Sequence, residues 1–152
     1  KRQGLCSNGK QIHNLGKNNP MKINSQTVIV SAPQQTVFDF LKDANNLIHL
    51  LPQDKITDFK ATKDECSFKV QGGVIISLVH DGEEGIDKVF MKSGEKSPFP
   101  FRLTIHTANK SDQTEGRIDF DGEVNMFLKM MVEKPLTNLF NYMSNKLKEH
   151  YA

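Results

Sequence analysis

The sequence predicts an α+β domain built from an antiparallel sheet of seven strands and a long C-terminal helix. Three observations predict it: a β-branched run near residue 28, six short alternating runs between residues 54 and 125, and an amphipathic stretch from 126 to 151. The chain has 152 residues, which fits one domain with a sizeable core. Apolar residues make up 37 % and charged residues 25 %, as in ordinary globular proteins.

Residues 1–20 are rich in Gly, Asn, Gln and Lys and show no helical or alternating periodicity. We interpret them as a flexible leader. Residues 21–152, which open with Met21, form the single predicted domain. Two origins of the leader stay open: a native basic arm for an acidic partner, or a segment that does not belong to the native protein.

The first patterned run, from Lys22 to Ser31, is β-branched and predicts a strand. Pro33 fits the first position of a short helix, with Ser31 as the candidate capping residue. A second short helix follows, for which Asn45 or Asn46 is the candidate cap.

Pro52 ends the second helix, and short alternating runs separated by turn residues follow it. The alternation of apolar and polar residues predicts a sheet with one buried face and one face in water. The breaks, among them Gly72-Gly73 and Asp81-Gly82, place six strands near residues 54–61, 65–71, 74–80, 86–93, 101–109 and 114–125.

The last element is predicted as one amphipathic helix from Met126 to Tyr151, capped by Asn125 and kinked by Pro135. Phe127 lies off its apolar arc, as do Met130 and Met131, which indicates either rephasing at the kink or a surface that faces something else. The arc itself contains Leu128, Val132, Leu136, Leu139, Phe140, Met143 and Leu147.

Charge and cysteine content exclude several classes of protein. Lysine and arginine number 20 against 18 acidic residues, a balance that argues against a nucleic-acid partner. Cys6 and Cys66 do not make a disulfide framework, which favours a cytoplasmic setting. No run is long and apolar enough for a membrane span, so we expect no integral membrane contact. No spacing typical of a metal or cofactor site is present, and we expect neither.

The order of elements resembles the helix-grip superfamily, also called SRPBCC, which includes START domains, the birch-pollen-allergen family and polyketide cyclases. The likeness covers residues 22–151 and is closest to a small bacterial branch. It implies a curved sheet wrapped around the C-terminal helix, with a cavity between them. The residues that carry it are Val28 to Pro33, Val37 to Leu41, Gly72-Gly73, Ser97 to Phe101 and Met130 to Leu136.

The resemblance and the apolar inward face together predict binding of a hydrophobic or amphipathic small molecule, lipid-like or polyketide-like, by a carrier or sensor without catalysis. The opening is expected between the small helices (Leu47, Leu50, Leu51), the Ser97–Phe101 loop and the first turns of the long helix. A solid core is the opposing interpretation. The predicted ligand-binding residues are Phe68, Val70, Met91, Phe101, Leu103, Ile105, Phe120, Val124, Leu128, Met131, Val132 and Leu139.

Two other functions remain open at this point. The first is a cyclase or hydrolase in which His49, His80 or Tyr142 acts on the bound molecule, since these side chains can hold or move a proton. The second is an interaction module that docks a partner, or a second copy in a homodimer, through an exposed apolar patch of Phe127, Met130 and Met131.

Overall fold

The computed structural model of the chain describes residues 19–70 and 72–152, so nearly all of the predicted leader lies outside the described residues. The first strand begins at Asn19, two residues before the predicted start of the domain. The elements are β2 (Asn19–Asn24), β3 (Val28–Val30), α2 (Gln34–Leu41), the 3₁₀ helix η1 (Ala44–His49), β4 (Thr57–Ala61), β5 (Glu65–Lys69), β6 (Ile75–Glu84), β7 (Lys88–Ser93), β8 (Phe101–Lys110), β9 (Gln113–Val124) and α3 (Met126–His150).

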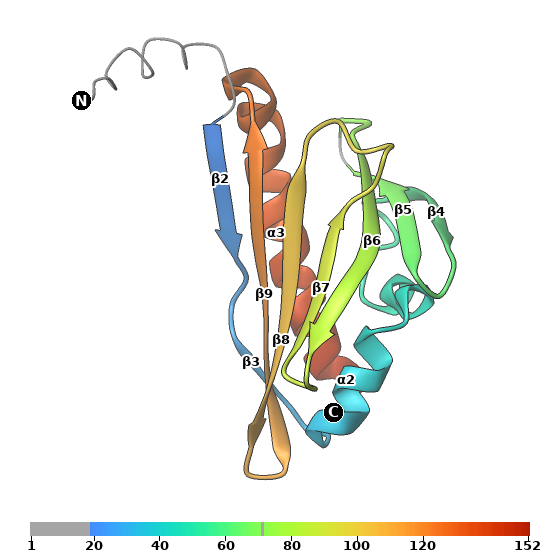
Figure 1. Cartoon of the computed structure of the whole chain (residues 1–152), viewed down its shortest axis with the longest axis vertical. Coiled ribbons are helices and arrows are strands. Elements are labelled where there is room, and N and C mark those ends of the chain that lie inside the picture. Colours follow the sequence, from blue (N-terminus) through green and yellow to red (C-terminus); the bar gives the residue numbers. More distant parts are fainter. Residues whose placement is uncertain (1–18, 71) are drawn as a thin grey trace, which may run out of the picture.

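All strands join one antiparallel sheet in the order β2-β9-β8-β7-β6-β5-β4, and β3 also pairs with β9. The sheet curves along one side of α3, while α2 and η1 lie near the end where the chain terminates (Figure 1). The predicted fold class is therefore confirmed: an open, curved antiparallel sheet with a long C-terminal helix.

The predicted first strand is two strands, because the chain leaves the ladder between Asn24 and Val28. There the Ser25 hydroxyl takes the place of a backbone carbonyl as a partner of β9. The N–H of Ser25 donates to the carbonyl of Ile118 at 2.8 Å, and its Oγ accepts from the N–H of Ile118 at 2.8 Å. A hydroxyl therefore fills the gap that the interruption leaves in the ladder.

The helix starts differ in part from the prediction. Pro33 is the N-cap of α2 rather than its first helical residue, and no side chain caps this helix, so Ser31 has no capping role. The carboxylate of Asp43 caps η1 by accepting from the N–H of Asn45 at 3.0 Å, so the prediction of an asparagine cap was wrong. Asn125 caps α3 as predicted, through a 2.7 Å bond from the N–H of Leu128.

Two strands depart from their predicted limits by three residues or more. β6 continues through Asp81-Gly82 to Glu84, because the ladder shifts register between His80 and Glu83 instead of ending. Gly82 adopts a φ of 101°, which a glycine tolerates within such an irregularity. β4 begins at Thr57 rather than near residue 54, since the residues after Pro52 form a turn.

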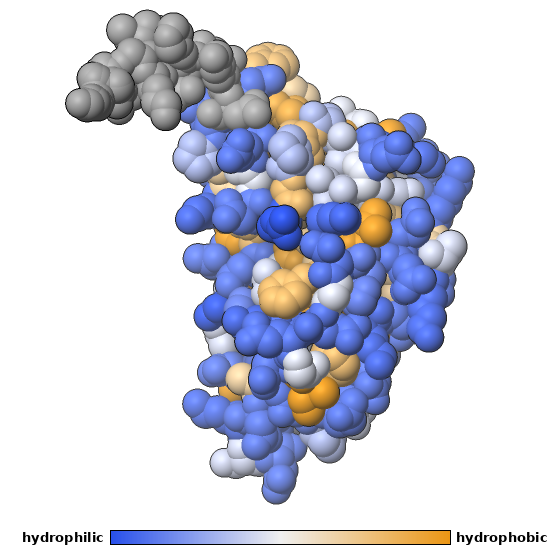
Figure 2. All heavy atoms as spheres, viewed as in Figure 1, coloured by the Kyte–Doolittle hydropathy of each residue, from blue (hydrophilic) through white to orange (hydrophobic). Residues whose placement is uncertain are grey.

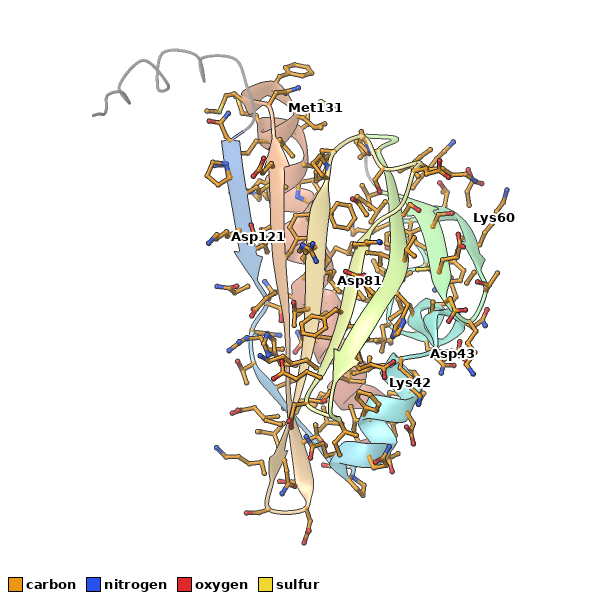
Figure 3. The ribbon with its side chains drawn as sticks, in the orientation of Figure 1. Lys42, Asp43, Lys60, Asp81, Asp121 and Met131 are labelled. Atoms are coloured by element: carbon orange, nitrogen blue, oxygen red, sulfur yellow. The ribbon has the colours of Figure 1, made fainter. Side chains whose placement is uncertain are left out.

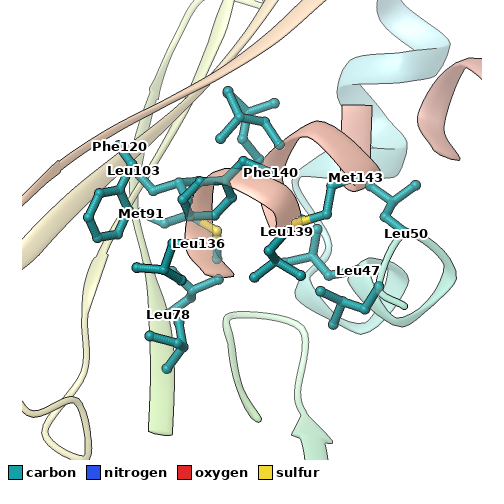
Figure 4. Packing of buried hydrophobic residues seen from close by; sticks show 14 of the residues in the cluster. Leu47, Leu50, Leu78, Met91, Leu103, Phe120, Leu136, Leu139, Phe140 and Met143 are labelled. Carbon is teal, nitrogen blue, oxygen red and sulfur yellow. The ribbon is translucent and has the colours of Figure 1, made fainter. Parts of the chain in front are cut away.

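The core fills the space between the inner face of the sheet and α3 (Figure 4). Aromatic rings join the layers, with the centroid of Phe120 5.3 Å from that of Phe140 and 4.9 Å from that of Phe101. The predicted apolar arc of α3 is buried except for Leu128, which is half-buried on the first turn. Side chains of α3 and of the sheet therefore pack against each other across the middle of the sheet. The pockets described below lie outside this packed region.

Candidate functional site

A pocket of about 390 Å³ lies beside α3, where the helix faces the chain that follows η1 and the end of β5. The segment after η1 lines one wall, and the middle turns of α3 line the other. The lining residues are Pro52, Asp54, Lys55, Ile56, Val70, Pro135, Asn138, Leu139 and Tyr142.

Two further pockets extend this one along α3. Towards the start of the helix, a pocket of about 420 Å³ shares Pro135 and Asn138 with it. Towards the end of the helix, a pocket of about 540 Å³ shares Asp54 and Tyr142 with it. Because neighbouring pockets share lining residues, we treat all three as one feature, the α3 groove. Its additional lining residues are Gly72, Met131 and Lys134 at one end, and Ile48, His49, Leu51, Gln53 and Lys146 at the other.

The wall opposite α3 is held by short hydrogen bonds within residues 48–56. The side-chain amide of Gln53 donates to the carbonyls of Ile48 at 2.9 Å and Leu51 at 3.1 Å. The N–H groups of Lys55 and Ile56 both donate to the carbonyl of Pro52. The result is a compact turn that presents Asp54 and Lys55 to the groove without requiring a strand.

The α3 groove is amphipathic. Its floor is apolar, since Ile56, Val70 and Leu139 are buried there, and its rim carries exposed polar side chains such as Asn138. Near the far end, the Lys146 ammonium lies 5.9 Å from the centroid of the Tyr142 ring. The arrangement suits a molecule with an apolar body and a polar end, because burial acts on one part and hydrogen bonds on the other.

No group of three or more His, Cys, Asp or Glu residues that could hold a metal ion is found within residues 19–70 and 72–152. Neither α3 nor any other helix in the same part of the chain combines the length and apolar character needed to cross a bilayer.

Comparison by sequence finds no family model and no curated protein that matches the chain. Comparison by structure finds several solved proteins that superpose on it. A START superfamily protein from Mycobacterium smegmatis is 15 % identical and superposes with a TM-score of 0.66, over 86 % of this chain and 96 % of that one. A protein from Thermus thermophilus is 14 % identical with a TM-score of 0.66, over 86 % and 96 % of the two chains.

Norcoclaurine synthase from Thalictrum flavum, solved in complex with dopamine and hydroxybenzaldehyde, is 16 % identical with a TM-score of 0.60, over 99 % of each chain. The chain has the helix-grip fold. The START-like, helix-grip resemblance predicted from the sequence is thereby confirmed at the level of the fold.

Within this helix-grip domain, the predicted ligand-binding residues separate into groups. Val70, Met131 and Leu139 line the α3 groove. Phe101 lines a separate hollow of about 440 Å³ among Lys92, Arg102 and other polar side chains. Leu128 is half-buried at the start of α3, and the remaining predicted residues are buried in the core at 5 % exposure or less: Phe68, Met91, Leu103, Ile105, Phe120, Val124 and Val132.

The expected opening also differs from the observed one. Leu51 lines the groove, but Leu47 and Leu50 are each 1 % exposed and belong to the core. Phe99 of the Ser97–Phe101 loop is buried, with its ring centroid 5.6 Å from that of Phe101. None of residues 97–101 lines the α3 groove; Pro100 and Phe101 border the separate hollow instead.

The three candidate catalytic residues do not come together. Tyr142 and His49 line the same end of the α3 groove. His80 lies elsewhere, on β6, with its Nε2 2.7 Å from Oε2 of Glu83. Cys66, which is also buried, is not an available nucleophile, because burial and then the Glu65 charge raise the pKa of its thiol to about 12.

Sequence reasoning missed the polar and proline residues of the groove, among them Pro52, Asp54 and Asn138. The search for inward-facing apolar positions could not find them. The available signal was the pair of prolines on the two walls: Pro52 lies in the turn after η1, and Pro135 lies inside α3, where it lacks the N–H that a helix interior normally uses.

The first two turns of α3 carry an exposed apolar surface made of Met126, Phe127, Met130 and Met131, here called the N-terminal patch. Some apolar atoms are visible at this end of the molecule, on a face that is otherwise largely polar with scattered apolar spots (Figure 2). Met131 lies near the start of α3 (Figure 3) and also lines the groove. The patch and the groove therefore meet at Met131.

Proposed function

We propose that the α3 groove binds a hydrophobic or amphipathic small molecule, lipid-like or polyketide-like, and that the protein is a carrier or sensor that leaves this molecule unchanged. The observation that carries the proposal is the groove's central pocket of about 390 Å³, with an apolar floor and a polar rim. Pockets that hold small molecules usually measure about 300 to 1,000 Å³. The helix-grip protein solved with dopamine and hydroxybenzaldehyde supports a small-molecule role for such a fold.

Burial of apolar surface supplies enough free energy for such binding. At about 25 cal/mol per Å², a ligand that loses roughly 300 Å² of apolar surface gains about 7 kcal/mol before ordering costs. The floor formed by Ile56, Val70 and Leu139 provides this contact. Asn138 and Tyr142 offer hydrogen bonds at the rim, and these would set the orientation of the ligand.

The side chains that could move protons do not come together in the groove. This separation favours binding without turnover. His80 does not line the groove, and burial raises the pKa of the Cys66 thiol to about 12. The alternative function is a cyclase or hydrolase that uses Tyr142 with His49 at the end of the groove. We place the protein in the cytoplasm, because the buried Cys66 is a free thiol.

A substitution that fills the groove tests the proposal. Asn138 is exposed on α3 and lines two of the three pockets, so Asn138→Trp would occupy the groove without disturbing the core. Asn145→Trp, also exposed on α3 but outside the groove lining, is the matched control. We expect Asn138→Trp to weaken uptake of a fluorescent fatty-acid probe at least about tenfold, and Asn145→Trp to leave it unchanged.

Equal uptake by both variants would contradict the proposed site. Native mass spectrometry before and after organic extraction addresses turnover. If the extracted ligand returns unaltered after incubation with fresh protein, the carrier or sensor function stands. If it is converted, and Tyr142→Phe abolishes the conversion, the enzyme alternative replaces it.

A further inference from the structure

The α3 groove differs in charge from the chain as a whole. Among the described residues, its charged lining side chains are Lys55, Lys134 and Lys146 against Asp54. The whole chain is nearly balanced, with 20 lysines and arginines against 18 acidic residues. The groove is therefore a local concentration of positive charge. A concave site lined by one sign of charge raises the local concentration of ligands of the opposite sign.

This positive charge is offset at one end of the groove. Near the C-terminus of α3, the Nζ of Lys146 lies 3.6 Å from Oε1 of Glu149, and it also faces the ring of Tyr142. Asp54 lines the same end. The carboxylates of Glu149 and Asp54 balance the Lys146 ammonium there, so this end offers little attraction to an anion.

The other two lysines approach one stretch of the groove from its two walls. Lys55 lines the central pocket from the turn after η1, and Lys134 lines the neighbouring pocket from α3. These two pockets share Pro135 and Asn138, so the lysines flank the place where the pockets join. Both lysines are exposed, and within residues 19–70 and 72–152 neither makes an ion pair. Their ammonium groups are available to a ligand.

Asn138 adds a hydrogen-bond donor between the two lysines. It follows Lys134 by four residues on α3, so these two side chains lie on the same face of the helix. Its side-chain amide has two N–H groups to donate. The apolar floor lies in the same central pocket and is made of Ile56, Val70 and Leu139, which are buried. Cations and a donor thus stand beside an apolar surface that leads away towards the end of α3.

We propose that the ligand of the α3 groove is an anionic amphiphile, whose carboxylate lies between Lys55 and Lys134 beside Asn138. Its apolar chain follows the floor towards Tyr142. This inference rests on the proposed function and adds to it the charge of the ligand and the end at which its head group binds. Each ammonium is a compact charge on a flexible stem, so both lysines reach a carboxylate at the rim. A cationic head group would meet repulsion at the same place.

Titration calorimetry of the full chain with decanoate, decylamine and decan-1-ol tests the proposal. The three compounds share one alkyl chain, and at neutral pH their head groups are negative, positive and uncharged. We expect decanoate to bind roughly tenfold more tightly than decylamine, because an exposed ion pair shifts an equilibrium by up to about fivefold and two lysines take part. Added salt should weaken the binding of decanoate and should not weaken that of decan-1-ol.

The double variant Lys55→Gln/Lys134→Gln replaces both cations with neutral polar side chains. We expect its preference for decanoate over decylamine to fall at least about fivefold. The matched control is Lys60→Gln/Lys148→Gln, which removes the same charge from two exposed lysines outside the groove lining and should keep the preference. Because all four side chains are exposed, both variants should unfold at the temperature of the unchanged protein.

The outcomes separate this inference from the proposed function. If decan-1-ol binds and decanoate binds no more tightly than decylamine, the anionic head group is wrong while the proposed function stands. A preference for decanoate that survives in Lys55→Gln/Lys134→Gln would overturn the assignment of these two lysines. If none of the three compounds binds, the inference and the proposed function fall together.

Discussion

The Oγ of Ser144 donates a 2.8 Å hydrogen bond to the Oγ of Ser25, which lies 119 residues earlier in the chain. Both side chains are buried. Ser25 lies in the break between β2 and β3, where its hydroxyl also accepts from the N–H of Ile118 in β9. One hydroxyl therefore links α3 to the sheet where its edge strand is interrupted.

The two serines should contribute unequally to stability. Ser144→Ala removes one donor, and Ser25 keeps its bond from Ile118, so we expect a loss of about 1 kcal/mol in the free energy of unfolding. Ser25→Ala leaves both the Ile118 N–H and the Ser144 hydroxyl without this partner, so we expect a loss of about 2 to 3 kcal/mol. Urea unfolding measures both values, and equal losses would contradict this account.

Gly94 should not tolerate a side chain. A Cβ at this position would overlap Oγ of Ser77 and lie 3.2 Å from Cγ2 of Val79, while the N–H of Gly94 is fixed by a 2.9 Å bond to the carbonyl of Ser77. We expect Gly94→Ala to lower the free energy of unfolding by about 1 to 3 kcal/mol. Adding Ser77→Ala should restore part of this loss, since it removes the overlapping atom. No recovery in the double variant would place the strain elsewhere.

Cys66 should make the protein less stable at alkaline pH. In the folded chain the pKa of its thiol rises from its usual 9.0 to about 12. The unfolded state therefore loses this proton first as the pH rises, and the folded state binds more protons between pH 9 and 12. Stability contributed by the neutral thiol is present below pH 9 and declines up to about pH 12.

Thiol labelling gives the matching measurement. In a Cys6→Ser background, we expect iodoacetamide to modify Cys66 of the folded protein far more slowly than Cys66 of the protein in urea. Rapid labelling of the folded protein near pH 8 would show that the thiol is neither shielded nor held protonated.

The N-cap of α3 should contribute measurably to the free energy of unfolding. The side chain of Asn125 accepts from the N–H of Leu128, and no acidic residue occupies the first turn of this helix. We expect Asn125→Ala to lower the free energy of unfolding by about 1 kcal/mol and Asn125→Asp to preserve it. Thermal unfolding of the two variants side by side makes the comparison, and similar losses would rule out capping as the cause.

The sequence predicted α3 well because periodicity and cap chemistry are local. Asn125, Pro135 and the arc from Val132 to Leu147 all lie where the pattern places them. The break in the first strand and the continuation of β6 past Asp81 were missed. Both depend on partner strands, through Ser25 with Ile118 and through the register of β6 against β7.

The site was predicted less well for a physical reason. Alternation shows which side chains face inward, and inward positions such as Met91 and Phe120 fill a core as readily as they line a cavity. The groove forms instead where two segments distant in sequence fail to meet closely, around Asp54 and Asn138. No local pattern encodes that gap.

The position of Asn19 affects how this protein is best handled. Because β2 enters the sheet opposite Val124, a tag fused directly to Asn19 would begin three residues in sequence from Phe127 on the paired strand and helix start. A helix of 25 residues at 1.5 Å each places Ala152 roughly 38 Å away. Purification handles and fluorophores therefore belong at the C-terminus.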